Sequence, residues 1–510
     1  MRLTQGLHRA ALVHAQGPGT SQGGTTRSWR ELRSRVARLA GGLAGLGVGT
    51  GDRVAILAFN ADRYFEAMYA IPWAGGIAVP LNTRLATAEL AAQLADCGAG
   101  HLLYGADFAG PARALAAAFP QIKPVCLDGD DWQDLAASPE ARDAERGGDD
   151  AAGIFYTGGT TGRAKGVVLS HANLIHNVLN LSPHFRFGRD TRCLHASPMF
   201  HIADALSIFG VTLHGGHHFF EPKFDAANVL RRIEDDRITF VAMVPTMLRM
   251  LVDQPDLARR DLSSLTRIFY GGSAMPGALA RRVVAALPHV RFHQGYGLTE
   301  TSPTITHLGP EDHQPAATDA RIQSAGQPVL TIDISIRDDR GQALAPGQNG
   351  EICVRGPTVM RGYWQNADAT ADAFADGWFR TGDIGRLDQD GYLHVVDRAK
   401  DMIISGGENI YSAEVENVLL QHPAVLECAV IGLPDAQWGE RVHAVVRPRP
   451  GTATTEDDLL AHCRAALARY KCPRSFRISP DALPLSGAGK VLKAELKRQA
   501  ISLSKETTHA

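Results

Sequence analysis

Apolar positions in the first part of the chain alternate between helical and extended spacing. Ser28 and Glu31 form the pattern of a capping box, and apolar residues recur at helical spacing over residues 32–43. Apolar runs at residues 52–58 and 76–81 have the length and content of buried strands. This alternation continues to about residue 300 and predicts layered α/β subdomains with largely parallel sheets.

The spacing changes after about residue 324. Short apolar stretches at residues 332–336 and 350–355, separated by turn residues, predict a β-rich subdomain. Beyond about residue 400, two extended stretches and a helix that opens at Thr455 predict a second section of helices and strands. The apolar stripe expected on that helix consists of Leu459, Cys463, Leu467 and Tyr470.

These patterns together predict an α/β fold with two domains. We expect a large N-terminal domain over residues 1–397, whose last part, about 324–397, is the β-rich subdomain. A smaller, mobile α+β C-terminal domain is expected over residues 398–510.

Composition and charge exclude several classes of protein. Of the 510 residues, 45% are hydrophobic and 21% are charged, which is ordinary globular usage and excludes a disordered or collagen-like chain. The formal net charge of -2 leaves little bulk charge for holding a nucleic acid or an anionic membrane. We therefore expect no nucleic-acid partner.

The cysteines and the apolar segments indicate the cellular compartment in which the protein is expected. None of the seven cysteines forms a Cys-x-x-Cys pair, so a zinc ribbon and a thioredoxin-like redox site are excluded. The N-terminus lacks the apolar segment of a secretory signal, and the longest uncharged apolar stretch, residues 67–81, is too short to span a bilayer. These features predict a soluble cytoplasmic protein with reduced thiols.

Residues 156–166 carry the most informative chemistry. They contain four glycines, three threonines and Lys165, so backbone N–H groups, hydroxyls and an ammonium can approach one anion. This set suits nucleotide phosphates, but a Walker A loop is excluded because Gly-Lys-Ser/Thr is absent and a strand is expected to follow. On these residues alone, a flexible Gly/Thr turn is an equally good interpretation.

The segment resembles the phosphate loop of the adenylate-forming superfamily, which includes AMP-forming acyl-CoA synthetases, firefly luciferase and peptide-synthetase adenylation domains. The usual pattern is Thr/Ser-Ser-Gly-Thr-Thr-Gly-x-Pro-Lys-Gly, and here Gly158 replaces the Ser and Ala164 replaces the Pro. The resemblance implies that the ATP phosphates are bound by Thr157, Gly159, Thr160, Thr161, Gly162 and Lys165.

Residues 296–301 resemble the superfamily's adenylate motif. The resemblance implies that Tyr296 stacks on adenine beside Gly297, that Thr299 touches the α-phosphate and that Glu300 binds Mg²⁺. A carboxylate is a hard oxygen ligand, which agrees with Mg²⁺ that bridges phosphates. The upstream strip of Gly272, Ser273 and Ala274 resembles the lining of the adenine and acyl pockets, although alone it fits a strand-ending turn equally well.

Two further segments resemble the ribose-binding motif and the hinge. Asp383, in the Thr-Gly-Asp at residues 381–383, is implied to accept both ribose hydroxyls. Within residues 397–401, Arg398 is implied to contact the nucleotide, and Lys400 is implied to be the residue about which the C-terminal domain rotates.

The C-terminal part carries two more motifs of the superfamily. The loop that faces the thiol acceptor is implied to consist of Ser405, Gly406, Gly407 and Glu408. Lys490, on a Gly-Ala-Gly arm, resembles the catalytic lysine and could bring an ammonium to a developing negative charge. Seen alone, it would be interpreted as a surface lysine, but six motifs in order over about residues 25–495 make the resemblance specific.

The acid substrate is less well defined. Residues 199–206 resemble the aromatic-His motif beside the acyl pocket, which implies that His201 lies near the substrate carboxylate, whereas a core histidine is an equal reading on the residues alone. No Asp occupies the position that binds an amino group in peptide-synthetase domains, although Asp204 is nearby. Metal binding by His214, His217 and His218 is disfavoured because no tetrahedral ligand set is evident.

The sequence therefore predicts an ATP-dependent acyl-CoA ligase that activates a fatty or aryl acid as an acyl-adenylate. It would use ATP, Mg²⁺ and CoA as co-substrate, with Lys490, Thr299, Glu300 and His201 as catalytic residues. An enzyme that loads a carrier-protein thiol and a non-catalytic nucleotide-binding protein are the alternatives. The oligomeric state is open, with a homodimer as one option.

Overall fold

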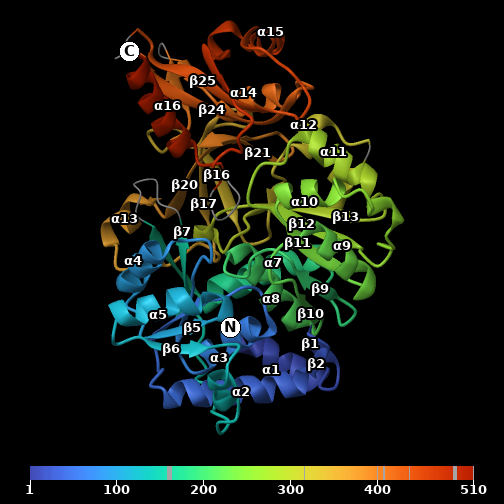
Figure 1. Ribbon diagram of the computed structural model, residues 1–510, viewed down its shortest axis with the longest axis vertical. Coiled ribbons are helices and arrows are strands. Elements are labelled where there is room, and N and C mark those ends of the chain that lie inside the picture. Colours follow the sequence, from blue (N-terminus) through green and yellow to red (C-terminus); the bar gives the residue numbers. More distant parts are fainter. Residues whose placement is uncertain are drawn as a thin grey trace.

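The computed structural model describes residues 1–157, 164–314, 316–398, 400–405, 408–435, 437–485 and 491–508, apart from the side chains of Asn409 and residues 503–508. The described residues form four β-sheets flanked by helices. Figure 1 shows the orange-red to red end of the chain, with α14, α15 and α16, as a lobe at the opposite end of the molecule from α1 and α2. None of the described helices combines the length and the apolar character needed to cross a membrane.

The first sheet has nine strands. Their order is β15 (Gln327–Pro328), β14 (Thr306–Leu308), β13 (Arg291–Tyr296), β12 (Arg267–Gly271), β11 (Phe240–Met243), β9 (Arg192–His195), β10 (His217–Phe220), β1 (Pro18–Gln22) and β2 (Thr25–Ser28). The neighbours from β13 across to β1 are parallel, and only the outer pairs of this sheet are antiparallel.

The second sheet has seven strands. Their order is β18 (Gly362–Tyr363), β8 (Lys165–Ser170), β7 (Ala151–Thr157), β4 (Ile77–Pro80), β3 (Arg53–Leu57), β5 (His101–Tyr104) and β6 (Lys123–Cys126). The strands from β7 to β6 are parallel, whereas β8 and β18 are antiparallel to their neighbours. The predicted layered α/β architecture with largely parallel sheets is confirmed.

The helices of this region follow the expected alternation. They are α1 (Thr4–Val13), α2 (Trp29–Gly45), α3 (Asp62–Trp73), α4 (Thr87–Cys97), α5 (Ala109–Ala118), α6 (Asp130–Ala136), α7 (His171–Phe185), α8 (Ile202–His214), α9 (Ala226–Asp235), α10 (Pro245–Val252), α11 (Gly277–Ala286) and α12 (Asp319–Ile322). Ser28 caps α2 as predicted, since its hydroxyl accepts from the Glu31 N–H while the Glu31 carboxylate accepts from the Ser28 N–H. In Figure 1, α7 and α8 lie between the two large sheets.

The two smaller sheets contain the strands described after residue 330, apart from β18. One contains β16 (Asp333–Arg337), β17 (Gly350–Arg355), β20 (Trp378–Leu387), β19 (Phe374–Ala375) and β21 (Leu393–Arg398), with α13 (Ala367–Asp372) beside it. The other contains β23 (Glu408–Ile410), β22 (Ile403–Ser405), β25 (Gly439–Pro448), β24 (Val425–Asp435) and β26 (Ser475–Ile478). Its helices are α14 (Ser412–Leu419), α15 (Glu456–Ala466) and α16 (Lys493–Thr508).

The helix opened by Thr455 is shorter than its predicted apolar stripe. Thr455 caps α15 as expected, and Leu459 and Cys463 are fully buried. The helix ends at Ala466, Leu467 is extended, and Tyr470 is 43% exposed in a separate 3₁₀ turn. The prediction that Leu467 and Tyr470 belong to the helical stripe was wrong because the helix ends before them, although Leu467 still packs against the same core as Leu459 and Cys463.

Buried histidines give the fold a dependence on pH. Burial, with the nearby Arg192 guanidinium, lowers the pKa of His217 to about 3, and burial lowers the pKa of His307 to about 3. The unfolded chain takes up these protons near pH 6.5, whereas the folded chain does not, so stability falls as the pH drops below about 6.5.

We expect the free energy of unfolding to fall between pH 6.5 and pH 5, by up to about 1.4 kcal/mol per pH unit for each such histidine. Replacing His217 by Gln removes one of these groups and should make this fall shallower. Urea unfolding at several pH values measures both slopes. An unchanged slope in the variant would contradict the assignment.

Candidate functional site

A buried carboxylate joins three residues that the sequence assigned to nucleotide binding. Tyr296, at the end of β13, donates its hydroxyl to Asp383 Oδ2 at 2.7 Å, and Arg398 Nε, at the end of β21, lies 3.3 Å from Asp383 Oδ1. Asp383 is 4% exposed and its backbone N–H donates to the Thr381 hydroxyl. Burial and the Asp383 charge raise the pKa of Tyr296, so its phenol is a stable neutral donor.

The turn after Tyr296 has a tightly fixed backbone. A Cβ at Gly297 would lie 1.8 Å from the Pro303 carbonyl oxygen, so only glycine fits there. The next residues form a 3₁₀ turn, Thr299–Thr301, which holds Glu300 at 9% exposure. Glu300 accepts twice, at its backbone carbonyl from the Met360 N–H at 2.8 Å and at Oε1 from the Tyr363 hydroxyl at 3.0 Å.

The phosphate-loop segment is the connection of a β-hairpin. The sequence predicted strands on both sides of this segment, and the structure has β7 ending at Thr157 and β8 beginning at Lys165. The structure adds that these two residues are antiparallel partners. The Thr157 hydroxyl donates to the Lys165 carbonyl, and Lys165 Nζ lies 4.7 Å from the centre of the Tyr363 ring. The predicted phosphate ligands Gly159, Thr160, Thr161 and Gly162 lie outside the described residues.

The strip of Gly272, Ser273 and Ala274 lies beside the Tyr296 turn. It follows directly on β12, which runs parallel to β13 with Gly271 opposite Gly295, so both strands end at the same edge of the sheet. Gly272 has a φ of +81°, which turns the chain after the strand, and all three residues are exposed. The strip is therefore placed to line the edge that holds Tyr296.

His201 and Asp204 both lie at the N-terminus of α8, but their side chains have different surroundings. His201 precedes the helix, is partly buried, and packs its ring on Phe200 with ring centres 4.3 Å apart. The Asp204 carboxylate instead lies in the core, with Oδ2 2.6 Å from His195 Nδ1. An interaction with a substrate amino group is therefore not available to Asp204 in this arrangement.

The histidines near α8 have structural partners. His218 lies 2.9 Å from His195, and its other ring nitrogen lies 3.1 Å from the Thr212 hydroxyl. Over the part of the chain that the structure describes, no group of three or more His, Cys, Asp or Glu side chains could hold a metal ion. The disfavoured metal reading of this cluster receives no support.

Glu300 fits the requirements of a Mg²⁺ ligand. Mg²⁺ is usually bound by one or two carboxylates together with substrate phosphates and waters, and not by an all-protein cage. Glu300 offers one hard carboxylate, held in place by Tyr363, near the hairpin that carries Lys165. A single fixed carboxylate without a protein cage is the donor set that such an ion needs.

The C-terminal residues are described in part. Ser405 lies in β22 at 8% exposure and pairs with Glu408 of β23, while Lys400 lies in the turn that precedes β22. Gly406, Gly407 and Lys490 lie outside the described residues. Leu485 and Val491 form an antiparallel bridge, so the chain on either side of the Lys490 segment is joined at its base.

A polar network that the sequence did not predict links Val491 and the residues after it to β21, the strand that ends at Arg398. Lys493 Nζ lies 2.5 Å from the Ser412 hydroxyl and 2.7 Å from Glu416 Oε1. The Ser412 backbone N–H and hydroxyl both donate to Asp397 Oδ2. The partners of Lys493 are about 80 residues away along the chain, so its local sequence does not reveal them. The one hint was its position three residues after Lys490.

Tyr363 was missed as well, since nothing in its local sequence connects it to Lys165 or Glu300. It reaches them because β18 pairs with β8 at the edge of the seven-stranded sheet. The position of this tyrosine in the site therefore follows from tertiary strand pairing.

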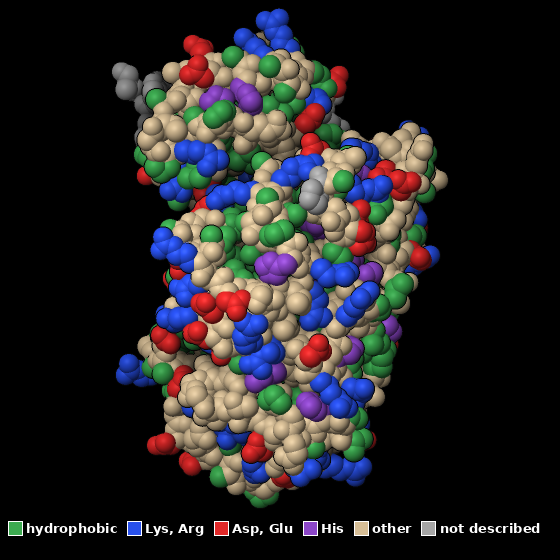
Figure 2. Space-filling view, turned by 90° about the vertical axis from the view of Figure 1, so that its right-hand side faces the viewer, with side chains coloured by type: hydrophobic (Ala, Val, Ile, Leu, Met, Phe, Trp, Pro, Cys, Tyr) green, Lys and Arg blue, Asp and Glu red, His purple; other side chains and the backbone are tan. Residues whose placement is uncertain are grey.

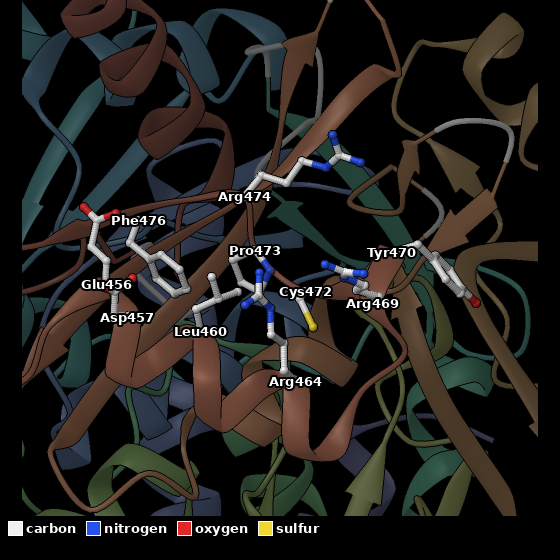
Figure 3. Close-up of a pocket in the computed structure, with 10 residues that line it drawn as sticks. All are labelled: Glu456, Asp457, Leu460, Arg464, Arg469, Tyr470, Cys472, Pro473, Arg474 and Phe476. Atoms are coloured by element: carbon white, nitrogen blue, oxygen red, sulfur yellow. The ribbon is translucent and has the colours of Figure 1, made fainter.

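A hollow of about 550 Å³ lies in the C-terminal lobe, apart from the residues just described. Figure 3 shows Arg464 rising from α15 beside Cys472, with Arg469 and Arg474 on the segment that follows the helix. In Figure 2, basic and acidic side chains are interspersed over the visible face, in keeping with the small net charge.

Comparison with protein families gives two matches along the chain. The AMP-binding enzyme model matches residues 4–364, and the AMP-binding enzyme C-terminal domain model matches residues 414–490. The first match alone covers more than half of the chain.

Characterised relatives match over nearly their full lengths. The chain is 43% identical over 493 residues to the feruloyl-CoA synthase of an Amycolatopsis species, covering 96% of this chain and 97% of the relative. It is 36% identical over 476 residues to the long-chain-fatty-acid–CoA ligase FadD13 of Mycobacterium tuberculosis, and this match covers 92% of this chain and 93% of the relative.

A solved structure extends the similarity to the whole fold. The o-succinylbenzoate CoA synthetase of Bacillus subtilis, in complex with its acyl-adenylate intermediate, superposes with a TM-score of 0.87 at 33% identity, covering 96% of this chain and 97% of that one. The chain therefore belongs to the AMP-binding enzyme family and is an AMP-forming acyl-CoA ligase.

Proposed function

We propose that the acid activated by this ligase is an aryl-substituted carboxylic acid. The observation that carries the proposal is the 43% identity to a feruloyl-CoA synthase over 96% of the chain, above the 36% identity to a long-chain fatty-acid ligase. The pairing of Asp204 with His195 in the core supports an acid without an amino group. Fatty acids are the second candidate class.

In the first step, a carboxylate oxygen of the acid attacks the α-phosphate of ATP and pyrophosphate leaves. Asp383 accepts the ribose hydroxyls, and its hydrogen bond from Tyr296 fixes the orientation of the tyrosine ring on which adenine stacks. The strip at residues 272–274 lines the adenine and acyl pockets, and Arg398 completes the nucleotide contacts through its pairing with Asp383. His201 lies at the carboxylate end of the acid.

Several groups of the chain stabilise the negative charge that develops at the phosphates. The residues that would hold the β- and γ-phosphates are Thr157, Gly159, Thr160, Thr161, Gly162 and Lys165. Thr299 donates to the α-phosphate, and Lys490 brings an ammonium to the transferring group. Glu300 would hold Mg²⁺, which neutralises phosphate charge when it is bound.

In the second step, the CoA thiol attacks the acyl carbonyl and AMP leaves. We propose that the domain of residues 398–510 rotates about Lys400 between the steps, which withdraws Lys490 and brings the loop of residues 405–408 toward the thiol. The family models support this boundary, since one ends at residue 364 and the other begins at residue 414. The Arg249–Glu427 ion pair, 3.2 Å long, joins α10 to β24 across the boundary and would be broken by rotation.

A reducing cytoplasmic location is part of the proposal, supported by the seven free cysteines. The homodimer stays a prediction.

The acid is tested by ATP–pyrophosphate exchange with hydroxycinnamic, benzoic, long-chain and short-chain fatty acids. We expect the highest kcat/KM for a hydroxycinnamic acid, by about tenfold or more over the fatty acids, which corresponds to about 1.4 kcal/mol of differential transition-state binding. A long-chain acid as the best substrate would reverse the ranking of the two candidate classes.

Lys490→Ala should lower adenylate formation by about a hundredfold or more, because an ammonium at the transferring phosphate is lost. Thioester formation from a supplied acyl-adenylate should change only a few-fold. Lys497→Ala, on the same C-terminal segment and paired with Glu440, is the matched control and should leave both half-reactions near normal. Equal loss of both half-reactions in Lys490→Ala would contradict the assigned role.

Lys400→Pro should have the opposite effect, because proline fixes φ at the pivot and hinders rotation. Adenylate formation is expected to be largely retained while thioester formation from the supplied adenylate falls at least tenfold. Single-turnover measurements of each half-reaction test this. Normal thioester formation in this variant would rule out Lys400 as the pivot.

A further inference from the structure

A two-residue strand from the β-rich region completes the phosphate hairpin. β18 pairs antiparallel with β8, with Tyr363 opposite Val167. The Trp364 N–H donates to the Gly166 carbonyl at 2.7 Å, and the Arg361 N–H donates to the Val168 carbonyl at 3.0 Å. The backbone at Tyr363 is therefore fixed relative to the strand that begins at Lys165.

The Tyr363 side chain touches both charged groups expected at the polyphosphate. Its hydroxyl donates to Glu300 Oε1 at 3.0 Å, and the Lys165 ammonium lies 4.7 Å from the centre of its ring. Its own backbone N–H donates to the Thr370 hydroxyl at 2.9 Å. One anchored side chain thus contacts a carboxylate with its edge and a cation with its face.

The chemistry of the phenol suits each contact. A phenol hydroxyl is a hydrogen-bond donor, which suits the contact of Tyr363 with the Glu300 carboxylate. The ring face is the negative side of the aromatic quadrupole and attracts the ammonium. A carboxylate and an ammonium in one partly buried site would otherwise attract each other and form an ion pair that bound substrate must first break.

We propose that Tyr363 is a positioning residue that holds Glu300 and Lys165 separately in place for the metal ion and for the phosphates. The hydroxyl orients Glu300 through Oε1 and so raises its affinity for Mg²⁺. The ring holds the Lys165 ammonium over its face, where it is available to the phosphates of ATP. This inference rests on the proposed roles of Glu300 and Lys165 in binding Mg²⁺ and ATP.

Two variants separate the two contacts, with ATP binding measured by calorimetry over a range of Mg²⁺ concentrations. Tyr363→Phe keeps the ring and loses the hydroxyl, so the Mg²⁺ concentration for half-maximal ATP binding should rise about five- to tenfold. Binding at saturating Mg²⁺ should stay close to normal. Tyr363→Leu loses both contacts and should in addition weaken ATP binding at saturating Mg²⁺ by about threefold.

Tyr392 provides a matched control outside the site. Its hydroxyl lies 3.2 Å from Asp312 Oδ2, and the Arg321 guanidinium carbon lies 3.5 Å from its ring centre, so it makes the same two kinds of contact. Tyr392→Phe should leave the Mg²⁺ dependence unchanged. A lower melting temperature in Tyr363→Phe with a normal Mg²⁺ dependence would show a merely structural role and overturn the inference.

Glu300→Gln, measured in the same way, separates failure of the inference from failure of the proposed function. If Glu300→Gln shifts the Mg²⁺ dependence and Tyr363→Phe does not, the positioning role of Tyr363 is wrong while the metal role of Glu300 stands. If neither variant shifts it, the proposed metal role of Glu300 is itself wrong.

Discussion

The burial of Asp383 constrains the site that we propose for the nucleotide. A carboxylate at 4% exposure is stable only if its oxygens find donors, and here the donors come from Tyr296 and Arg398. Tyr296 ends a strand of the nine-stranded sheet, whereas Arg398 ends the last strand of the β-rich sheet. One side chain therefore fixes the position of one sheet relative to the other at the point where a nucleotide would bind.

The same constraint limits where a rotating domain can begin. Successive residues of a strand point to opposite faces, so Arg398 can pair with Asp383 while Asp397, its neighbour, accepts from Ser412 of α14. The chain is thus bound to the N-terminal side through Arg398 and to the C-terminal side through Asp397. The proposed pivot at Lys400 lies between Asp397 and Ser412 along the chain, so a rotation about it would have to break the hydrogen bonds that join them.

The parts of the fold that the sequence predicted are those set by local chemistry. The capping box at Ser28 and the strands around the Gly/Thr segment are each specified by a few adjacent residues. The roles assigned to the motifs came from resemblance, and the pairing of Tyr296, Asp383 and Arg398 brings three of those residues together.

What the sequence did not predict depends on contacts between distant segments. Tyr363 lies in the site only because a two-residue strand pairs with the edge of β8, and a strand so short has no periodicity to detect. Lys493 likewise acquires its partners from α14. The stripe expected through Leu467 and Tyr470 failed for a related reason, since apolar spacing specifies a helical face but not the residue at which the helix ends.

The pairing of Asp204 with His195 in the core relates the fold to the kind of acid that the enzyme can bind. Its carboxylate lies in the first turn of α8, where a negative charge is favoured by the helix dipole, and it is bound to His195 of β9. This anchor holds the start of the helix, and with it His201, against the nine-stranded sheet. Because the Asp204 carboxylate is buried in the core, it does not present a negative charge to an ammonium group beside His201. This arrangement supports the proposal of an acid without an amino group.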